Sequence, residues 1–210
     1  MSNDDKRAEA AEALREFAHL FVGRASDDHT LDQITQAARA WTAELEQREI
    51  RVRDFHGHSF EKWHQGGDEL PEAGRRHVFA DSIVTGESNP MGLAARQWRE
   101  EEVSCAEAVF DRAFEGAPGR AHGGILAALL DETMGRVPAI LGALAFTVQL
   151  DISYRAPTPL YELVTARAWC AKREGRKFFI SAEVRSKDGL VAEAQAIFVA
   201  VDPTRFVAPV

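Results

Sequence analysis

Apolar side chains recur at helical spacing in two stretches of the first fifty residues. Residues 4–22 carry them three and four positions apart, and a second run follows "SDD" at 26–28, whose side chains can cap a helix. The pattern therefore predicts two helices, which pair as a hairpin or pack on the domain that follows. The positions expected to be buried in the second helix are Leu31, Ile34, Ala38, Trp41 and Leu45.

Residues 51–90 show no sustained periodicity and are rich in glycine and charge, which predicts a loop with a short helix. We place the boundary here, with a helical extension at 1–79 and a separate domain at 80–210. The domain contains six segments with strand character: "GLAARQW", "VSCAEAVF", "AFTVQLDISY", "ELVTARAWCAKRE", "KFFISAEVRS" and "LVAEAQAIFVAV". Tight turns such as "KDG" at 187–189 require antiparallel neighbours.

The alternation in "AFTVQLDISY" is nearly strict. It predicts one buried face and one polar face, the second formed by Thr147, Gln149, Asp151 and Ser153. The side chains expected on the buried face are Phe146, Val148, Leu150, Ile152 and Tyr154.

Between the second and third strand segments lies "GRAHGGILAALLDE" at 119–132, a helix that is apolar nearly all round and is therefore expected to be buried. It is predicted to end near Gly135 and Pro138. A sheet must then wrap this helix, which makes an α+β domain. A second copy that continues the sheet would also cover its exposed edge, which predicts a dimer.

The two ends of this helix carry candidate chemistry. The first backbone N–H groups of a helix lack partners, and Gly123 and Gly124 leave them open to a carbonyl oxygen, although the glycines also suit a plain entry turn. Asp131 lies seven residues beyond Gly124, on nearly the same face but about 10 Å further along the axis. An antiparallel helix from a two-fold partner could bring such a carboxylate to the glycines. The alternative is that Asp131 and Glu132 face solvent.

Composition narrows the class of protein. The chain has 210 residues, a net charge of −8 and no basic stripe, so nucleic acid is not expected as a partner. No apolar run reaches ~18 residues, so no membrane span is expected, and the N-terminus lacks the apolar segment of a signal peptide. Cys105 and Cys170 are far apart, which fits a reducing cytoplasm.

The segment "AHGGILAALLDE" resembles the HGG-x6-Asp/Glu signature of hotdog-fold acyl-CoA thioesterases, in the PaaI-like branch named for the phenylacetate pathway. Three further stretches resemble this family: "NPMGL" at 89–93, "FEGAPGRAHGG" and "TVQLDISYRAPTP". The resemblance covers about residues 80–203. It implies a hotdog fold, an antiparallel sheet wrapped around one central helix, here with a helical N-terminal extension.

The resemblance also implies roles for single residues. Asp131 matches the catalytic carboxylate, a general base or nucleophile, with Glu132 as the substitute. Gly124 matches the residue whose N–H polarises the thioester carbonyl; Gly123 adjoins it, and His122 shapes the turn. Thr147 matches a hydroxyl residue that orients water. An asparagine that many members carry six residues before the histidine is replaced here by Gly116.

Coenzyme A brings phosphates, which Arg and Lys bind well. Candidates for substrate binding are Asn89, Arg155, Arg173, Arg176 and Lys177, with Lys187 a further basic candidate. The three histidines of "FHGHSFEKWH" (His56, His58, His64) could bind a metal, but a polar loop is favoured. Alternatively this stretch forms a lid in which Phe55, Phe60 and Trp63 line an acyl pocket.

The expected activity is hydrolysis of an acyl-CoA to a free acid and CoA by a homodimer or homotetramer. No metal or cofactor is expected, and water would be activated by Asp131 of the partner subunit. One alternative is a non-catalytic acyl-CoA-binding or regulatory module on the same fold. Another is a hydratase or dehydratase, for which His122 at a glycine turn is poorly placed. An α/β-hydrolase is disfavoured because "GxSxG" is absent.

Overall fold

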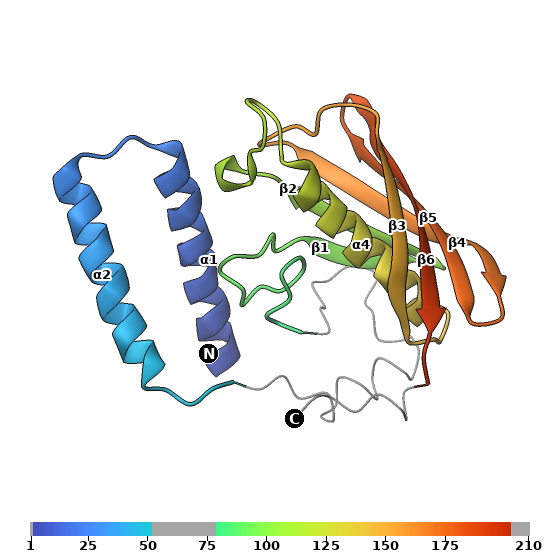
Figure 1. The fold of residues 1–210 in the computed structure, drawn as a ribbon, viewed down its shortest axis with the longest axis horizontal. Helices are drawn as coiled ribbons and strands as arrows, with labels where there is room; N and C mark the ends of the chain where they lie inside the picture. The colour runs from blue at the N-terminus through green and yellow to red at the C-terminus, as the bar shows by residue number, and fades with distance from the viewer. Residues whose placement is uncertain (1, 52–78, 203–210) are drawn as a thin grey trace.

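The computed structural model describes residues 2–51 and 79–202 (Figure 1). Two N-terminal helices, α1 (Asn3–Gly23) and α2 (Asp28–Glu46), precede a domain built from a sheet and one long helix, α4 (Gly123–Ile140). The helix starts follow the expected capping chemistry, since the Ser2 side chain caps α1 and the Asp27 side chain caps α2.

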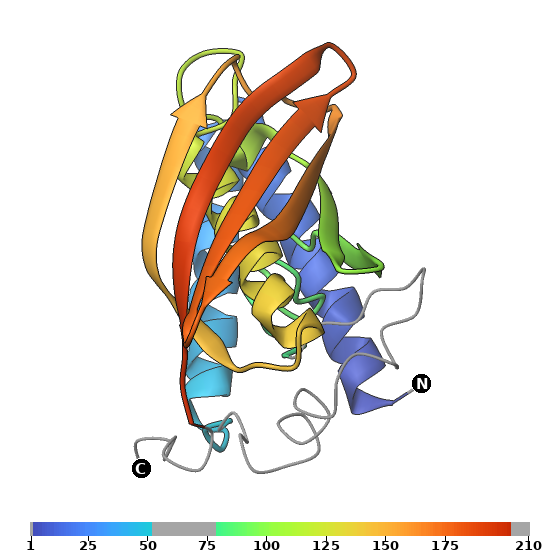
Figure 2. The same cartoon turned by 90° about the vertical axis from the view of Figure 1, so that its right-hand side faces the viewer.

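One antiparallel sheet of six strands forms the domain, in the order β1-β2-β4-β5-β6-β3. Its strands curl around α4, which lies between the sheet and the N-terminal helices (Figures 1 and 2). This arrangement confirms the predicted α+β class with a sheet around one helix. The strands are β1 (Arg96–Glu100), β2 (Val103–Val109), β3 (Ala145–Tyr154), β4 (Leu163–Glu174), β5 (Lys177–Ser186) and β6 (Gly189–Ala200).

The core forms where α4 meets the inner face of the sheet. Leu126, Leu129, Leu130, Met134 and Val137 of the helix are fully buried. The strands facing them carry many alanines, whose small side chains let the backbone of the sheet approach the helix closely. The buried alanines of β4, β5 and β6 are Ala166, Ala168, Ala182, Ala192, Ala194 and Ala196.

The predicted end of the central helix near Gly135 and Pro138 is wrong. The helix runs through both residues to Ile140, with Pro138 in its last turn. Proline there removes only one late hydrogen bond, and the burial of Val137, Pro138 and Ala139 in the core offsets that loss.

Strand β3 departs from the predicted alternation at Val148. Thr147 pairs with Phe198 and Gln149 with Ile197, so Val148 is the extra residue of a β-bulge. Phe146 and Val148, expected on the buried face, are exposed. Thr147, expected on the polar face, shares the face of its buried partner Phe198 and is directed towards α4. The bulge is the physical reason, because one extra residue exchanges the two faces of a strand.

Helix α1 docks on the domain through the loop before β1 and through the short helix η1 (Arg112–Phe114). The Arg15 guanidinium donates to the carbonyls of Glu87 (2.9 Å) and Asn89 (2.8 Å), and His19 Nδ1 accepts from the Ala113 N–H (3.0 Å). The His19 ring also packs edge-on against Phe114, with centroids 5.1 Å apart. The extension therefore supports the segments that precede β1 and α4.

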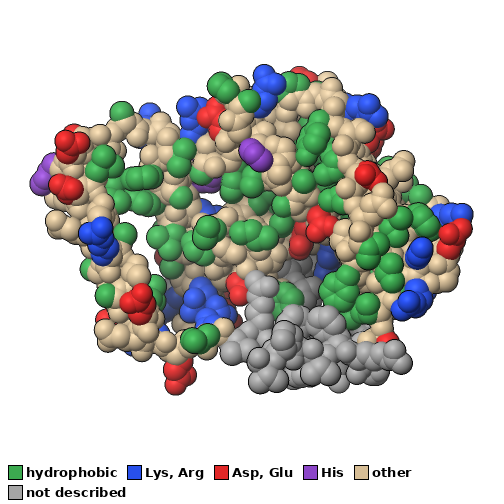
Figure 3. Space-filling model, in the orientation of Figure 1, with side chains coloured by type: hydrophobic (Ala, Val, Ile, Leu, Met, Phe, Trp, Pro, Cys, Tyr) green, Lys and Arg blue, Asp and Glu red, His purple; other side chains and the backbone are tan. Residues whose placement is uncertain are grey.

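The predicted burial of the α2 stripe is wrong. No residue of α2 is buried, and Trp41 and Leu45 are 68% and 67% exposed. Amphipathic spacing marks a face as apolar but does not supply the surface that covers it. In Figure 3 hydrophobic side chains line the space between α1 and α2 instead of closing it.

None of the helices within residues 2–51 and 79–202 combines the length and apolar character needed to cross a bilayer. The histidines and aromatic residues of "FHGHSFEKWH" lie outside the described residues.

Candidate functional site

The start of α4 is a tightly anchored turn. His122 is the N-cap, and its backbone N–H donates to the Phe114 carbonyl (2.8 Å), while the Ala121 N–H donates to the Thr158 carbonyl (3.0 Å). The loop into the helix is thereby tied both to the short helix η1 (Arg112–Phe114) and to the loop that precedes β4. The first amides of α4 consequently have a fixed position.

The His122 side chain occupies one of those amides. Its Nδ1 accepts a hydrogen bond of 2.9 Å from the Gly124 N–H. A ring nitrogen that accepts carries no proton, so the neutral imidazole holds its proton on Nε2. The Gly123 N–H, as the first amide of the helix, has no intrahelical acceptor. An incoming carbonyl oxygen can therefore use Gly123 directly but must displace His122 to use Gly124.

Tyr154, at the end of β3, covers the same turn. Its hydroxyl donates to the Gly123 carbonyl at 2.9 Å. A Cβ on Gly123 would lie only 3.2 Å from the Tyr154 hydroxyl oxygen, so the aromatic side chain packs directly on the glycine. The alternation predicted that Tyr154 lies on the buried face of β3, but its side chain is 52% exposed. Nothing in the sequence indicated that its hydroxyl reaches the glycine pair.

The second half of the candidate site lies in the middle of α4. Asp131 is half-buried, and its Oδ1 accepts a hydrogen bond of 2.8 Å from the Thr147 hydroxyl. The bulge at Val148 turns Thr147 towards α4, and Thr147 stays accessible to solvent. Within one chain this pair stands about 10 Å along the helix axis from Gly124.

Glu132 points into a different environment from Asp131. Its carboxylate accepts from the Thr85 hydroxyl at 3.0 Å, and its carbonyl accepts from Gln97 Nε2 at 3.4 Å. Burial lowers the pKa of the Arg136 guanidinium below its usual value, and the charge of Glu132 acts in the opposite direction. Glu132 therefore ties α4 to the segment before β1 and to β1 itself.

Gly116, the position at which the resemblance leads to an expectation of asparagine, lies against His122. A Cβ at this position would come within 2.8 Å of His122 Cα. The adjacent Glu115 holds the loop instead, with Oε1 accepting from the Gly119 N–H (2.6 Å) and Oε2 paired with Arg112 (2.9 Å). This loop has no space for an asparagine side chain at 116 without movement of the His122 backbone.

The structure separates the predicted substrate-binding residues. Asn89 uses both ends of its side chain within its own loop, with Nδ2 donating to the Asp81 carbonyl and Oδ1 accepting from the Met91 N–H. Arg155 follows Tyr154 at the α4 N-terminal end and pairs with Glu193 (2.7 Å).

Three of the remaining basic candidates lie at the opposite end of the sheet. Arg173, Arg176 and Lys177 surround the β4–β5 hairpin, where Arg173 stacks on Phe178 at 4.5 Å. All three are exposed. Lys187, the further candidate, pairs with Glu162 at 2.8 Å.

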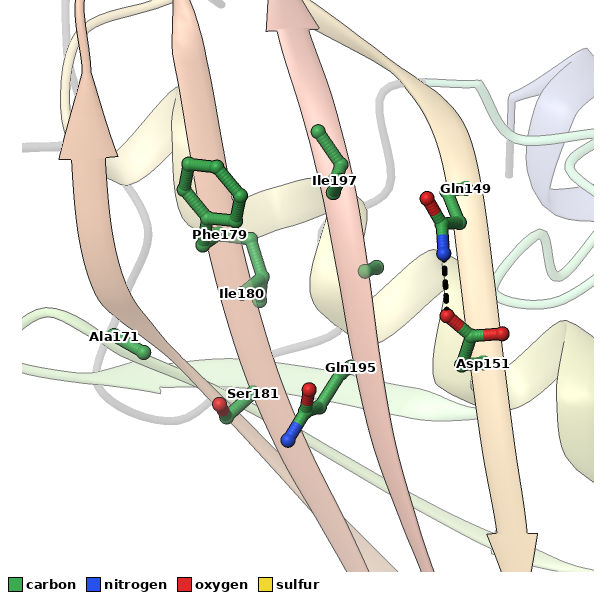
Figure 4. Close-up of a pocket in the computed structure, with 9 residues that line it drawn as sticks. Gln149, Asp151, Ala171, Phe179, Ile180, Ser181, Gln195 and Ile197 are labelled. Carbon is green, nitrogen blue, oxygen red and sulfur yellow. Dashed lines mark hydrogen bonds between the residues drawn. The ribbon is translucent and has the colours of Figure 1, made fainter.

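A hollow of about 350 Å³ lies on the outer face of the sheet, away from α4. Gln149, Asp151, Ser181 and Gln195 border it, and the Gln149 amide donates to Asp151 at 2.6 Å (Figure 4). These side chains alternate with the inward ones that face the helix. The hollow contains neither Asp131 nor the glycine turn and is therefore separate from the candidate site. Across residues 2–51 and 79–202 no three His, Cys, Asp or Glu side chains are grouped to hold a metal.

A family model described as "Thioesterase superfamily" matches residues 118–193, which span α4 and most of the sheet. This stretch is a thioesterase superfamily domain. It contains His122, the glycine pair, Asp131 and Thr147, and the resemblance recognised in the sequence is confirmed at this level.

Relatives with curated names match part of this chain. The acyl-coenzyme A thioesterase THEM4 of Mus musculus is 40% identical over 93 residues, which are 43% of this chain and 40% of that protein. The acyl-coenzyme A thioesterase THEM5 of Mus musculus is 37% identical over 86 residues, 40% of this chain and 35% of that protein. The matched region thus spans less than half the length of these relatives.

Solved structures share the fold of this thioesterase superfamily domain. A crystal structure of a thioesterase superfamily protein superposes with a TM-score of 0.75 at 22% identity, covering 92% of this chain and 90% of that one. The PaaI protein of E. coli, from the phenylacetic acid degradation operon, gives 0.50 at 16% identity over 52% of this chain and 81% of that one. The hotdog fold is confirmed, and the first superposition extends over most of the chain.

Proposed function

We propose that this protein hydrolyses an acyl-CoA thioester to a free acid and coenzyme A. The observation that carries the proposal is the hydrogen bond between Thr147 and Asp131 within a thioesterase superfamily domain. The Thr147 proton is committed to Asp131, so the remaining lone pairs of the hydroxyl are free to accept. A water that donates one proton to Thr147 and the other to Asp131 has its lone pair directed at a nearby carbonyl carbon.

The reaction needs only these groups and water. Asp131 takes a proton from the water as its oxygen bonds to the thioester carbon, and the carbonyl oxygen gains negative charge. The amides at the start of α4 stabilise that oxyanion. When the oxyanion collapses, the carbon–sulfur bond breaks, and the proton held by Asp131 passes to the departing CoA thiolate. The acid is released, and Asp131 returns to its ionised state.

The two halves of the site come from two subunits in this proposal. Asp131 is too far along α4 to serve the amides of its own helix, because seven residues correspond to about 10 Å. A two-fold axis beside β3 would place the two α4 helices antiparallel, with each carboxylate facing the other N-terminus. The position of β3 at one end of the sheet order supports such a dimer, as do the exposed Phe146 and Val148 on that strand.

The basic hairpin is our candidate for the CoA phosphates. Arg173, Arg176 and Lys177 are exposed, and they lie at the α4 C-terminal end of the sheet. An antiparallel partner would carry its own hairpin to the end where the glycine turn lies. Arg155 is already at that end, although its charge is shared with Glu193. Asn89 is proposed to act only by shaping the loop before β1.

One observation favours a second function, a non-catalytic acyl-CoA-binding module. The Gly124 N–H is occupied by His122 Nδ1 rather than open to a carbonyl. A domain that kept this bond would retain a pocket but would lack half of its oxyanion site.

The deciding experiment is thiol release from a panel of aromatic, short-chain and medium-chain acyl-CoAs, with the wild type beside Asp131→Asn. The substitution preserves shape and removes the base, so we expect kcat to fall by about 100-fold or more, the scale of a lost general base. Glu132→Gln is the matched control and should retain activity, because Glu132 bonds Thr85. Binding of CoA esters without turnover would instead establish the binding module. Turnover unchanged in Asp131→Asn would remove the assigned base.

A further inference from the structure

One peptide group at the start of α4 is held by side chains at both ends. The Gly123 carbonyl and the Gly124 N–H belong to the same planar peptide unit. The carbonyl accepts from the Tyr154 hydroxyl at 2.9 Å, and the N–H donates to His122 Nδ1 at 2.9 Å. The peptide expected to polarise the substrate is therefore fixed on one side by β3 and on the other by the helix cap.

The Tyr154 hydroxyl is placed by rigid backbone. Tyr154 pairs with Ala192 of β6, and the next two amides, those of Arg155 and Ala156, both donate to the Val191 carbonyl at 2.8 and 3.1 Å. The ring lies on Gly123 so closely that a Cβ there would sit 3.3 Å from the ring carbon Cζ. Glycine at 123 thus allows this close approach without any shift of the ring, which gives that residue a role besides leaving an amide open.

Donation to a peptide carbonyl also changes the N–H of the same peptide. Hydrogen bonds in a chain polarise one another, so a donor at the carbonyl makes the N–H a stronger donor. When a thioester carbonyl replaces His122 Nδ1 at the Gly124 N–H, the bond from Tyr154 persists and keeps the peptide in place. The effect increases as the carbonyl oxygen becomes an oxyanion, because bonds to charged groups are the strong ones.

From this geometry we infer that Tyr154 is a positioning residue that holds and polarises the Gly123–Gly124 peptide for catalysis. The inference rests on the function proposed above. It assigns Tyr154 a share in transition-state stabilisation without contact with the reacting atoms. Its loss should therefore lower kcat more than it raises KM.

The kinetic test uses Tyr154→Phe, which keeps the ring and removes the hydroxyl. We expect kcat on the best acyl-CoA of the panel to fall roughly 3- to 10-fold, the scale of one neutral hydrogen bond, with KM within about 2-fold. Gly123→Ala, which presses a Cβ against the same hydroxyl, should act in the same direction. Tyr161→Phe is the matched control, because Tyr161 is the other tyrosine of the chain and is exposed.

A spectroscopic test separates this role from a structural one. In the Asp131→Asn background, the carbonyl stretch of the bound acyl-CoA is compared with and without Tyr154→Phe by Raman difference spectroscopy. We expect the stretch at lower frequency when Tyr154 is present. An identical frequency, or a kcat unchanged by Tyr154→Phe while Asp131→Asn is inactive, would overturn the inference and leave the proposed function intact. Absence of hydrolysis by the wild type would reject the proposed function itself.

Discussion

The Thr147 hydroxyl donates a 2.8 Å hydrogen bond to Oδ1 of Asp131, although the two side chains come from different elements 16 residues apart. This contact exists because β3 carries one extra residue, Val148, which turns Thr147 from the outer face to the helix face. A bulge beside a functional side chain is a frequent way to redirect it. The geometry of one strand irregularity thus brings together the two residues assigned to water activation.

Replacing Thr147 with valine tests the assignment. Valine fills nearly the same volume but cannot donate to Asp131 or accept from water, so we expect kcat to fall roughly 10- to 100-fold, the scale of a hydrogen bond to a charged group. The midpoint of thermal unfolding should change little because Thr147 is exposed. Thr165→Val is the control, since β4 is not a neighbour of β3. Full activity in Thr147→Val would exclude the hydroxyl from the mechanism.

We expect the N-cap residue of α4, His122, to contribute to the free energy of unfolding. His122→Ala removes the acceptor of the Gly124 N–H, and we expect the free energy of unfolding to fall by about 1 kcal/mol, as for other lost N-caps. His122→Asn should recover most of that loss, because asparagine is a strong N-cap residue. Urea denaturation of the three proteins measures both effects. Equal stability of the wild type and His122→Ala would show that the cap contributes nothing in solution.

The contact between Gly116 and His122 predicts that the asparagine expected from the resemblance cannot be introduced at position 116 without cost. Gly116→Asn places a Cβ 2.8 Å from His122 Cα, so we expect a loss of about 1–3 kcal/mol in unfolding free energy, as for other overpacked sites. Gly135→Ala serves as the control glycine substitution. Its Cβ would lie 3.6 Å from the Phe198 ring, an ordinary contact, and alanine favours the helix. A fully stable and more active Gly116→Asn would contradict the observed loop geometry.

Cys105 predicts a pH dependence of stability at high pH. Burial raises the pKa of its thiol from 9.0 to about 11. Between those values the unfolded chain releases the proton while the folded chain retains it, so the folded state binds more protons and its stability falls as pH rises from about 9 to about 11. Below pH 9 the Cys105 thiol is protonated in both the folded and the unfolded state, so its full contribution to stability is present.

The unfolding free energy of the wild type and Cys105→Ala, measured at matched pH values, isolates this contribution from that of other titrating groups. We expect the difference between the two proteins to shrink as pH rises through that range. A constant difference would show that the thiol titrates alike in the folded and unfolded states.

The sequence predicted the elements whose signals are local. Helix periodicity and capping residues located α1 and α2, and the tight turn at 187–189 set β5 and β6 antiparallel. Three errors concern effects that local pattern does not contain. A single extra residue at Val148 reverses a strand face without changing its composition, and the apolar face of α2 says nothing about what covers it. Pro138 continues a helix because burial outweighs one lost hydrogen bond.

For the candidate site, the motif identified candidate residues but not their tertiary contacts. His122, the glycine pair and Asp131 follow from spacing along one helix, which fixes their relative positions. The bond from Tyr154 to Gly123 depends on how the end of β3 meets the start of α4, which is tertiary geometry. The hydrogen bond from the Thr85 hydroxyl to the Glu132 carboxylate is likewise tertiary geometry, because the two residues are 47 positions apart in the sequence.

The proposed mechanism requires Asp131 of one subunit to serve the glycine turn of another, and subunit mixing tests this requirement directly. Asp131→Asn and Gly124→Pro, which removes the amide N–H within the first helical turn, should each be inactive alone. After co-refolding, mixed dimers contain one intact site, and about a quarter of wild-type activity should return if subunits pair at random. Size-exclusion chromatography must first show that both variants keep the oligomeric state of the wild type. Recovery to that level is the predicted result, whereas continued inactivity of a verified mixed dimer would contradict a shared site.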